Sequence, residues 1–192
     1  MRLYIFDMGE VVAFNTDVFP AVCDHLGVTI EQFCEFAGSN LEMLMDGAVT
    51  ADEFWDRFSS KYGGPISEEL FVKYFNPRLD HDVAAIVSRL KNRARVVCGT
   101  NTFDPHYDYL APRGYYDLFD AVYASNKMGV SKPHPEFYQH ILNAEGARPE
   151  DAVFIDDAET NVRAAEKLGM QAILFRGSDS LQSEIAILTQ CS

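Results

Sequence analysis

The sequence is poor in cysteine and has none of the cysteine patterns that organise small or metal-binding domains. Among its 192 residues are four cysteines, Cys23, Cys34, Cys98 and Cys191. No two of them have the spacing of a CxxC pair, so the sequence indicates neither a zinc site nor a disulfide framework. We therefore expect free thiols in a protein of a reducing compartment.

Long hydrophobic runs and an excess of basic residues are also missing. No apolar run approaches the ~18 residues of a membrane-spanning helix, and Asp7 interrupts the first apolar segment before a signal peptide could form. Lys and Arg number 16 against 29 Asp and Glu, a net charge of −13. This charge opposes binding to nucleic acid or to an anionic membrane. We expect a cytoplasmic monomer or homodimer whose partner is a small molecule.

Short apolar runs recur along the chain in the pattern of a parallel β-sheet. Five runs are too short for buried helices and have polar or glycine neighbours, as strands covered on both faces do: Leu3–Phe6, Arg95–Cys98, Ala121–Tyr123, Val153–Ile155 and Ala172–Phe175. Helical patterns separate the last four runs: Asp104–Gly114, Pro135–Glu145 and Thr160–Gly169. The alternation predicts an α/β fold with a doubly wound parallel sheet.

The segment between the first two predicted strands has a different pattern. Residues 16–76 contain no strand-like run and predict four or five helices. Thr50 and Glu53 have the spacing of a capping box, which typically begins a helix. Aromatic residues of this segment, Phe54 and Trp55 among them, are expected in a small core rather than against a substrate. The predicted organisation is a core domain of residues 1–15 and 77–192 with a helical cap of residues 16–76.

Polar residues follow the predicted strands where each one ends, or lie in a loop nearby. Ligands of open α/β sheets bind beyond these carboxyl ends. The residues gathered there would be Asp7, Gly9, Thr100, Asn101, Lys132, Asp156 and Asp157. Carboxylates this close repel one another unless a cation intervenes, and oxygen ligands suit Mg²⁺. A carboxylate nucleophile, with a metal ion and an ammonium group to neutralise oxygens, fits phosphoryl transfer.

Four segments resemble, in order, the four motifs of the haloacid dehalogenase (HAD) superfamily of hydrolases. They are Phe6–Val12, Thr100–Asn101, Lys132–Tyr138 and Phe154–Val162. Their order and strand context make the resemblance specific. In detail they look most like the branch that contains α-D-glucose-1-phosphate phosphatases. The resemblance implies a Rossmann-like core with a cap after strand one, and a Mg²⁺-dependent phosphatase of a small phosphorylated metabolite, in particular a sugar phosphate.

The resemblance also implies a role for each candidate residue. Asp7 would be the nucleophile, assisted by the ammonium group of Lys132. The implied Mg²⁺ ligands are Asp7, the backbone carbonyl of Gly9, Asp156 and Asp157, with Asp156 either binding the ion or orienting a bound water. The implied phosphoryl-binding residues are Thr100, Asn101 through its backbone or its side chain, and Lys132.

One position departs from the superfamily's pattern. Its phosphatases usually carry a second Asp two residues after the nucleophile, as the general acid for the leaving group, but Gly9 stands there. Three interpretations stay open. Glu10 could replace the acid, the leaving group could be weakly basic, as in an anomeric sugar phosphate, or the protein could hydrolyse poorly or not at all.

Two other functions are alternatives to the phosphatase. In an L-2-haloacid dehalogenase of this fold, the Asp attacks carbon and no metal is needed. Such an enzyme would gain nothing from the acidic pair Asp156–Asp157. A non-catalytic protein could keep the pocket and bind a phosphorylated ligand without turnover. We expect His106 and His134 to be structural or surface residues, because no second histidine or cysteine lies at metal-ligand spacing, and Cys98 to belong to the core.

Overall fold

Five parallel strands form the central sheet of the computed structural model, which describes residues 2–66 and 68–190. Their order across the sheet is β5-β4-β1-β6-β7. The strands are β1 (Leu3–Phe6), β4 (Arg95–Thr100), β5 (Ala121–Ala124), β6 (Ala152–Asp156) and β7 (Gln171–Leu174). Each predicted apolar run coincides with a strand, except that Phe175 lies one residue beyond β7, so the prediction of a doubly wound α/β sheet is confirmed.

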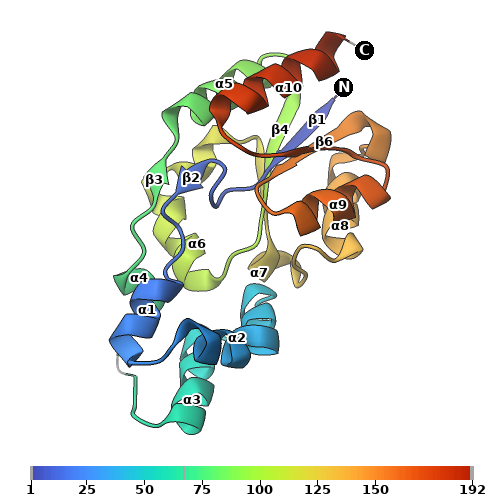
Figure 1. The fold of residues 1–192 in the computed structure, drawn as a ribbon. Coiled ribbons are helices and arrows are strands. Elements are labelled where there is room, and N and C mark those ends of the chain that lie inside the picture. The colour runs from blue at the N-terminus through green and yellow to red at the C-terminus, as the bar shows by residue number, and fades with distance from the viewer. Residues whose placement is uncertain (1, 67, 191–192) are drawn as a thin grey trace.

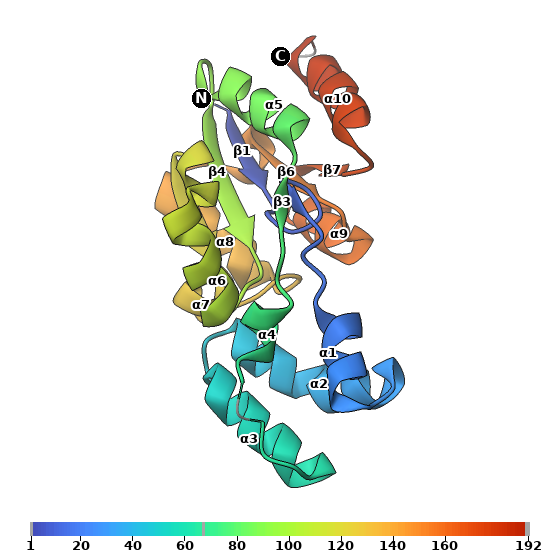
Figure 2. The same cartoon turned by 90° about the vertical axis from the view of Figure 1, so that its left-hand side faces the viewer.

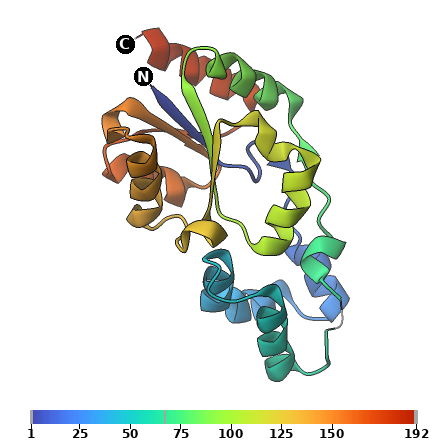
Figure 3. The same ribbon diagram turned by 180° about the vertical axis from the view of Figure 1, so that it is seen from behind.

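Helices cover both faces of this sheet (Figures 1 and 3). They are α5 (His81–Lys91), α6 (Asp104–Leu110), α7 (Ser125–Met128), α8 (Pro135–Glu145), α9 (Glu159–Lys167) and α10 (Ser178–Gln190), with the 3-10 helices η1 (Ala111–Arg113), η2 (Tyr115–Leu118) and η3 (Pro149–Asp151). Leu3 and Ile5 of β1 share a buried cluster with α8. Tyr4 and Phe6 share the other cluster with α5 and α10. Covering on both faces explains why β1 is apolar throughout.

The segment after β1 is helical, as predicted. It forms α1 (Phe19–Leu26), α2 (Ile30–Met45), α3 (Ala51–Tyr62) and α4 (Leu70–Lys73), and α2 is bent at Gly38. The capping box is confirmed, because Glu53 N donates to Thr50 Oγ1 at 3.2 Å and Thr50 N donates to Glu53 Oε2 at 2.8 Å. Phe54 and Trp55 are buried. Figures 1 and 2 show α1, α2 and α3 beyond the carboxyl ends of the strands. The division into core and cap stays a prediction.

Several elements differ from the sequence prediction. The short strands β2 (Ala13–Phe14) and β3 (Arg78–Leu79) pair as an antiparallel ribbon. They lie where the chain leaves the central sheet after β1 and where it returns before α5. Each strand is too short to show a periodic pattern. The sequence patterns also did not predict helices α5, α7 and α10. The predicted helix after β4 ends early, as α6, and continues as η1, because Pro112 has no N–H to donate.

Two observations bear on the expected environment of the protein. No helix in the described ranges is long and apolar enough to cross a membrane. Cys23, Cys34 and Cys98 are free thiols, as predicted, and Cys98 is buried in β4. Cys191 lies outside the described residues.

The C-terminal end of α2 touches the sheet domain directly. Ser125 in α7 donates its hydroxyl to the carbonyl oxygen of Met45 at 2.6 Å. Gly47 has a φ of +66°, and a Cβ added there would lie 2.4 Å from the carbonyl oxygen of Asn126. Because real Cβ atoms do not approach a backbone oxygen this closely, only glycine permits the contact. It holds the end of α2 against α7.

Replacing Gly47 tests how much this contact stabilises the protein. We expect Gly47→Ala to lower the free energy of unfolding by ~3 kcal/mol, since it adds a clash with backbone to the strain of a positive φ. Gly27→Ala is the matched control, because Gly27 has a φ of +65° and nothing within 4 Å of its added Cβ. Gly27→Ala should lower the free energy of unfolding by only ~1 kcal/mol, the strain of the positive φ alone. If urea unfolding shows equal losses of unfolding free energy in the two variants, the contact between Gly47 and Asn126 does not stabilise the protein.

Candidate active site

Asp7 stands at the carboxyl end of β1, at the edge of the sheet that faces α1 and α2. Its backbone N–H donates to the carbonyl oxygen of Ile155 in β6 at 2.9 Å, which continues the ladder one residue beyond the strand. Its Oδ1 accepts from the N–H of Met8 at 2.8 Å, and the residue is 8% exposed. The side chain is therefore held in one place by backbone groups and is almost removed from water.

Lys132 places its ammonium group between two carboxylates. The Nζ atom lies 2.8 Å from Asp7 Oδ1 and 2.7 Å from Asp156 Oδ2, and the residue is 4% exposed. Burial alone would lower the pKa of Lys132, but the charges of Asp7 and Asp156 outweigh burial and raise it. Burial raises the pKa of Asp7 to about 6, Lys132 opposes that rise and Asp156 adds to it. The lysine therefore stays charged and compensates the two buried acids.

The acidic pair at the end of β6 completes the set of carboxylates. Asp156 is fully buried, and its Oδ1 accepts from Ala158 N at 2.9 Å and Asn161 Nδ2 at 3.0 Å. Asp157 is exposed over much of its surface, but partial loss of water around its carboxyl group, together with the charge of Asp156, raises its pKa. One oxygen from each of Asp7, Asp156 and Asp157 lies within 4.8 Å of the other two. The structure thus brings together the three predicted acidic ligands.

These oxygens fit a magnesium ion. Mg²⁺ holds oxygen ligands at ~2.1 Å, so two ligands on opposite sides of the ion are about 4 Å apart. Three carboxylate oxygens within 4.8 Å of one another therefore need only small shifts to share one ion. The cluster contains no nitrogen or sulfur ligand, which favours Mg²⁺ over zinc. Gly9 lies two residues beyond Asp7 in the same loop, as the predicted carbonyl ligand requires.

Thr100 and Asn101 come from the end of β4 and have different surroundings. Thr100 is buried, and its hydroxyl donates to the carbonyl oxygen of Asn101 at 3.3 Å. The side chain of Asn101 binds the backbone of Lys132 twice. Asn101 Nδ2 donates to Lys132 O at 2.9 Å, and Asn101 Oδ1 accepts from Lys132 N at 2.8 Å. The amide of Asn101 therefore positions Lys132, a role that the sequence did not predict.

Glu10, the predicted substitute acid, is tied to the beginning of the cap segment. Its Oε1 accepts from Thr16 N at 2.9 Å and from Thr16 Oγ1 at 2.8 Å. A Cβ added to Gly9 would lie 3.3 Å from the same Thr16 hydroxyl. The hydrogen-bonded residues Glu10 and Thr16 therefore lie beside Gly9, the position where related phosphatases carry their acid. The catalytic role of Glu10 stays a prediction.

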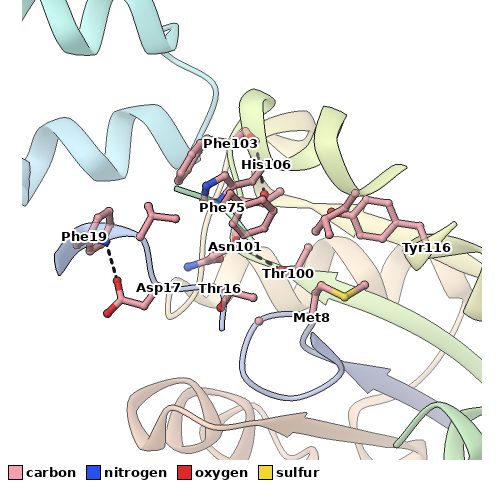
Figure 4. A pocket seen from close by; sticks show the side chains of 14 residues that line it. Met8, Thr16, Asp17, Phe19, Phe75, Thr100, Asn101, Phe103, His106 and Tyr116 are labelled. Carbon is pink, nitrogen blue, oxygen red and sulfur yellow. Dashed lines mark hydrogen bonds between the residues drawn. The ribbon is translucent and has the colours of Figure 1, made fainter. Parts of the chain in front are cut away.

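A cavity of about 380 Å³ opens beside the loop that follows Asp7 (Figure 4). At one end it is lined by Met8 and Gly9 of this loop and by Thr100 and Asn101. The rest of its lining comes from residues 16–19, from the chain after α4, from the segment between β4 and α6, and from α6 and η2. The lining residues that sequence reasoning missed are Asp17, Val18, Phe19, Phe75, Thr102, Phe103, Leu110 and Tyr116. Most of them follow no strand, so the rule that located the acids could not find them.

His106 lines this cavity and is held by contacts with α4 and the residues that follow it. Its Nε2 lies 3.2 Å from the carbonyl oxygen of Phe71, and its ring stacks on Phe75 with 3.7 Å between centroids. Burial lowers its pKa to about 4, so the imidazole is neutral at pH 7. The predicted structural role of His106 agrees with these contacts.

Comparisons of sequence place the chain among known hydrolases. A family model described as a haloacid dehalogenase-like hydrolase matches residues 1–169. Sesquiterpene phosphatase astK from Aspergillus oryzae is 30% identical over 196 residues, which cover 97% of this chain and 96% of that protein. Drimenol cyclase drtB from Aspergillus calidoustus is 28% identical, and this chain spans 36% of its length.

Solved structures share the fold. A HAD-like hydrolase from Porphyromonas gingivalis superposes with a TM-score of 0.82 at 25% identity, over 98% of each chain. A HAD family enzyme from Bacteroides thetaiotaomicron, crystallised with magnesium and inorganic phosphate, has a TM-score of 0.74 at 23% identity, over 92% of this chain and 94% of that one. The finer resemblance to glucose-1-phosphate phosphatases stays a prediction. By the family model and the four motifs, the chain belongs to the haloacid dehalogenase-like hydrolases.

Proposed function

We propose that this hydrolase is a Mg²⁺-dependent phosphatase that releases phosphate from a small phosphorylated metabolite through an aspartyl-phosphate intermediate. The observation that carries the proposal is the buried group Asp7–Lys132–Asp156, with Asp157 close enough to share a metal ion. It offers a nucleophile, a fixed positive charge and oxygen ligands at one point. The phosphatase name of the relative astK supports the same reaction class.

The reaction proceeds in two displacements at phosphorus. In the first, an oxygen of Asp7 bonds to phosphorus, the bond to the alcohol oxygen breaks, and the alcohol leaves with a proton taken from solvent or a nearby acid. In the second, water bonds to phosphorus, the bond to Asp7 breaks, and inorganic phosphate forms with a proton released. Lys132 and the Thr100 hydroxyl bind the phosphoryl oxygens, whose negative charge they stabilise.

Asp7, Asp156, Asp157 and the carbonyl of Gly9 would hold Mg²⁺. When bound, the ion supplies positive charge that reduces the repulsion between the Asp7 carboxylate and an anionic substrate. The net charge of −13 repels phosphate monoesters at long range, so attraction has to come from this site. The magnesium and phosphate in the Bacteroides neighbour support this assignment.

The glycine in place of the usual acid affects how the leaving group is protonated. Gly9 has no side chain that could protonate the leaving oxygen, so the proton comes from solvent or from another acid, and among alcohols of similar shape the less basic one leaves more readily. The sequence predicts a sugar phosphate on this ground, an anomeric one in particular.

The metal-free dehalogenase is the less favoured alternative. That reaction needs no cation, whereas Asp156 and Asp157 lie beside the nucleophile and need one to relieve their mutual repulsion. A non-catalytic phosphate-binding protein would use the same residues, and only turnover separates it from an enzyme.

Removing the nucleophile or the metal tests the proposal. We expect Asp7→Asn to lower phosphate release from p-nitrophenyl phosphate at least ~10³-fold, and EDTA to abolish release by the wild type until Mg²⁺ is restored. Asp24→Asn is the control, because Asp24 is an exposed acid in α1, and it should behave as the wild type. Release that survives EDTA, or Asp7→Asn with near-normal turnover, would contradict the mechanism. Chloride release from 2-chloropropionate in EDTA would establish the dehalogenase instead.

A second variant tests whether Asn101 positions Lys132. Asn101→Asp keeps the acceptor for Lys132 N but sets an oxygen against Lys132 O, so we expect a loss of ~1–3 kcal/mol in unfolding free energy and at least ~10-fold in kcat. Asn92→Asp is the control, since Asn92 is exposed and its amide makes only a 3.4 Å hydrogen bond to Ser88. A wild-type kcat in Asn101→Asp would contradict a role for Asn101 in positioning Lys132.

A further inference from the structure

The cavity beside Asp7 changes character with distance from the phosphoryl site. Its catalytic end, at Gly9 and Thr100, is polar. Beyond that end the walls are apolar and come from five different segments of the chain: Met8, Val18, Phe19, Phe75, Phe103 and Leu110. All of these are buried except Phe19, which is half-buried. Figure 4 shows Phe75, Phe103 and His106 close together along one side.

The polar groups in this lining are already engaged with the protein. Both polar atoms of the Asn101 side chain bind Lys132, and the Thr16 hydroxyl donates to Glu10. Asp17 accepts from the N–H of Phe19 at 3.0 Å and is exposed. His106 binds the Phe71 carbonyl and is neutral. A ligand in the cavity would therefore find few free hydrogen-bonding partners.

Among the described lining residues, Tyr116 has the one buried side-chain polar atom without a partner. It is 8% exposed, and its hydroxyl is buried without a hydrogen-bond partner in the described part of the chain. Such an unpaired group is costly unless a ligand or water satisfies it. One hydroxyl can serve one polar group of a ligand, whereas a sugar brings several hydroxyls into the cavity. Each sugar hydroxyl that lost water without gaining a partner would weaken binding.

We infer that the leaving group of the substrate is an apolar alcohol of ring or short isoprenoid size, held against Val18, Phe75, Phe103 and Leu110, rather than a sugar. This inference rests on the proposed phosphatase function. The volume of about 380 Å³ agrees with the size, because small-molecule sites span roughly 300–1,000 Å³. Burial of a hydrocarbon group there supplies binding energy that the acidic surface of the protein does not.

A comparison of two primary-alcohol monoesters tests the substrate class. Benzyl phosphate and glucose 6-phosphate both release a primary alcohol, so their difference reports the cavity rather than the leaving-group chemistry. With Mg²⁺ we expect kcat/KM for benzyl phosphate to exceed that for glucose 6-phosphate at least ~10-fold, and 3-methylbut-2-enyl phosphate to follow benzyl phosphate. Equal or higher kcat/KM for glucose 6-phosphate or glucose 1-phosphate would overturn the inference.

A matched pair of variants tests the apolar wall itself. Val18 and Val22 are both buried and stand one helical turn apart at the start of α1, but only Val18 lines the cavity. Val→Thr keeps the shape and adds a hydroxyl. We expect Val18→Thr to lower the ratio of kcat/KM for benzyl phosphate to that for acetyl phosphate about 10-fold. Val22→Thr should leave the ratio within about 2-fold of wild type, and an unchanged ratio in Val18→Thr would contradict the inference.

The outcomes separate this inference from the function on which it rests. If the wild type releases no phosphate from acetyl phosphate or from any phosphate monoester, p-nitrophenyl phosphate included, the phosphatase proposal fails and the inference fails with it. If release is Mg²⁺-dependent and lost in Asp7→Asn, but sugar phosphates are the better substrates, the phosphatase stands and the apolar leaving group is wrong.

Discussion

The buried ammonium group of Lys132 is the interaction on which the site depends. Asp7 and Asp156 come from neighbouring strands and lie almost out of water, where an uncompensated carboxylate costs several kcal/mol. Lys132 contacts both, and Asn101 from a third strand end holds the lysine backbone. Residues far apart in the chain thus meet because parallel strands bring their carboxyl ends to one edge. Removing Lys132 would leave both carboxylates without their shared positive charge.

In the proposed reaction, the site separates the two halves of a phosphate monoester. The phosphoryl group would lie with the charged residues, where Lys132 and a metal ion would oppose the acidic character of the protein. The alcohol would lie in the cavity, whose walls include contacts such as that of Phe75 with His106. Because residues 16–76 supply Val18 and Phe19 and the end of β4 supplies Thr100, substrate selection and chemistry would depend on both parts of the chain.

The sequence predicted the strands and their polar ends, because a run buried on both faces and an acid placed directly after it leave a strong local signal. Asp7, Asp156 and Asp157 were found in this way, whereas Lys132 was found in a loop, by its place in the third motif. Local patterns do not tell which partner a side chain chooses, so the two hydrogen bonds from the Asn101 side chain to the Lys132 backbone could not be predicted. Binding of a phosphoryl oxygen by Asn101 stays a prediction. Likewise, Tyr116 on a 3-10 turn and Phe75 after α4 form a cavity only in the folded chain.

The central claim is that Asp7 carries the phosphoryl group during turnover. The most direct measurement is to mix the enzyme with Mg²⁺ and excess substrate, quench in acid within milliseconds, and locate the phosphoryl group by mass spectrometry of the peptides. The account predicts a phosphorylated peptide containing Asp7 that disappears when substrate is exhausted. A phosphoryl group on the peptide of Asp156 and Asp157, or steady turnover with no phosphorylated peptide, would contradict it.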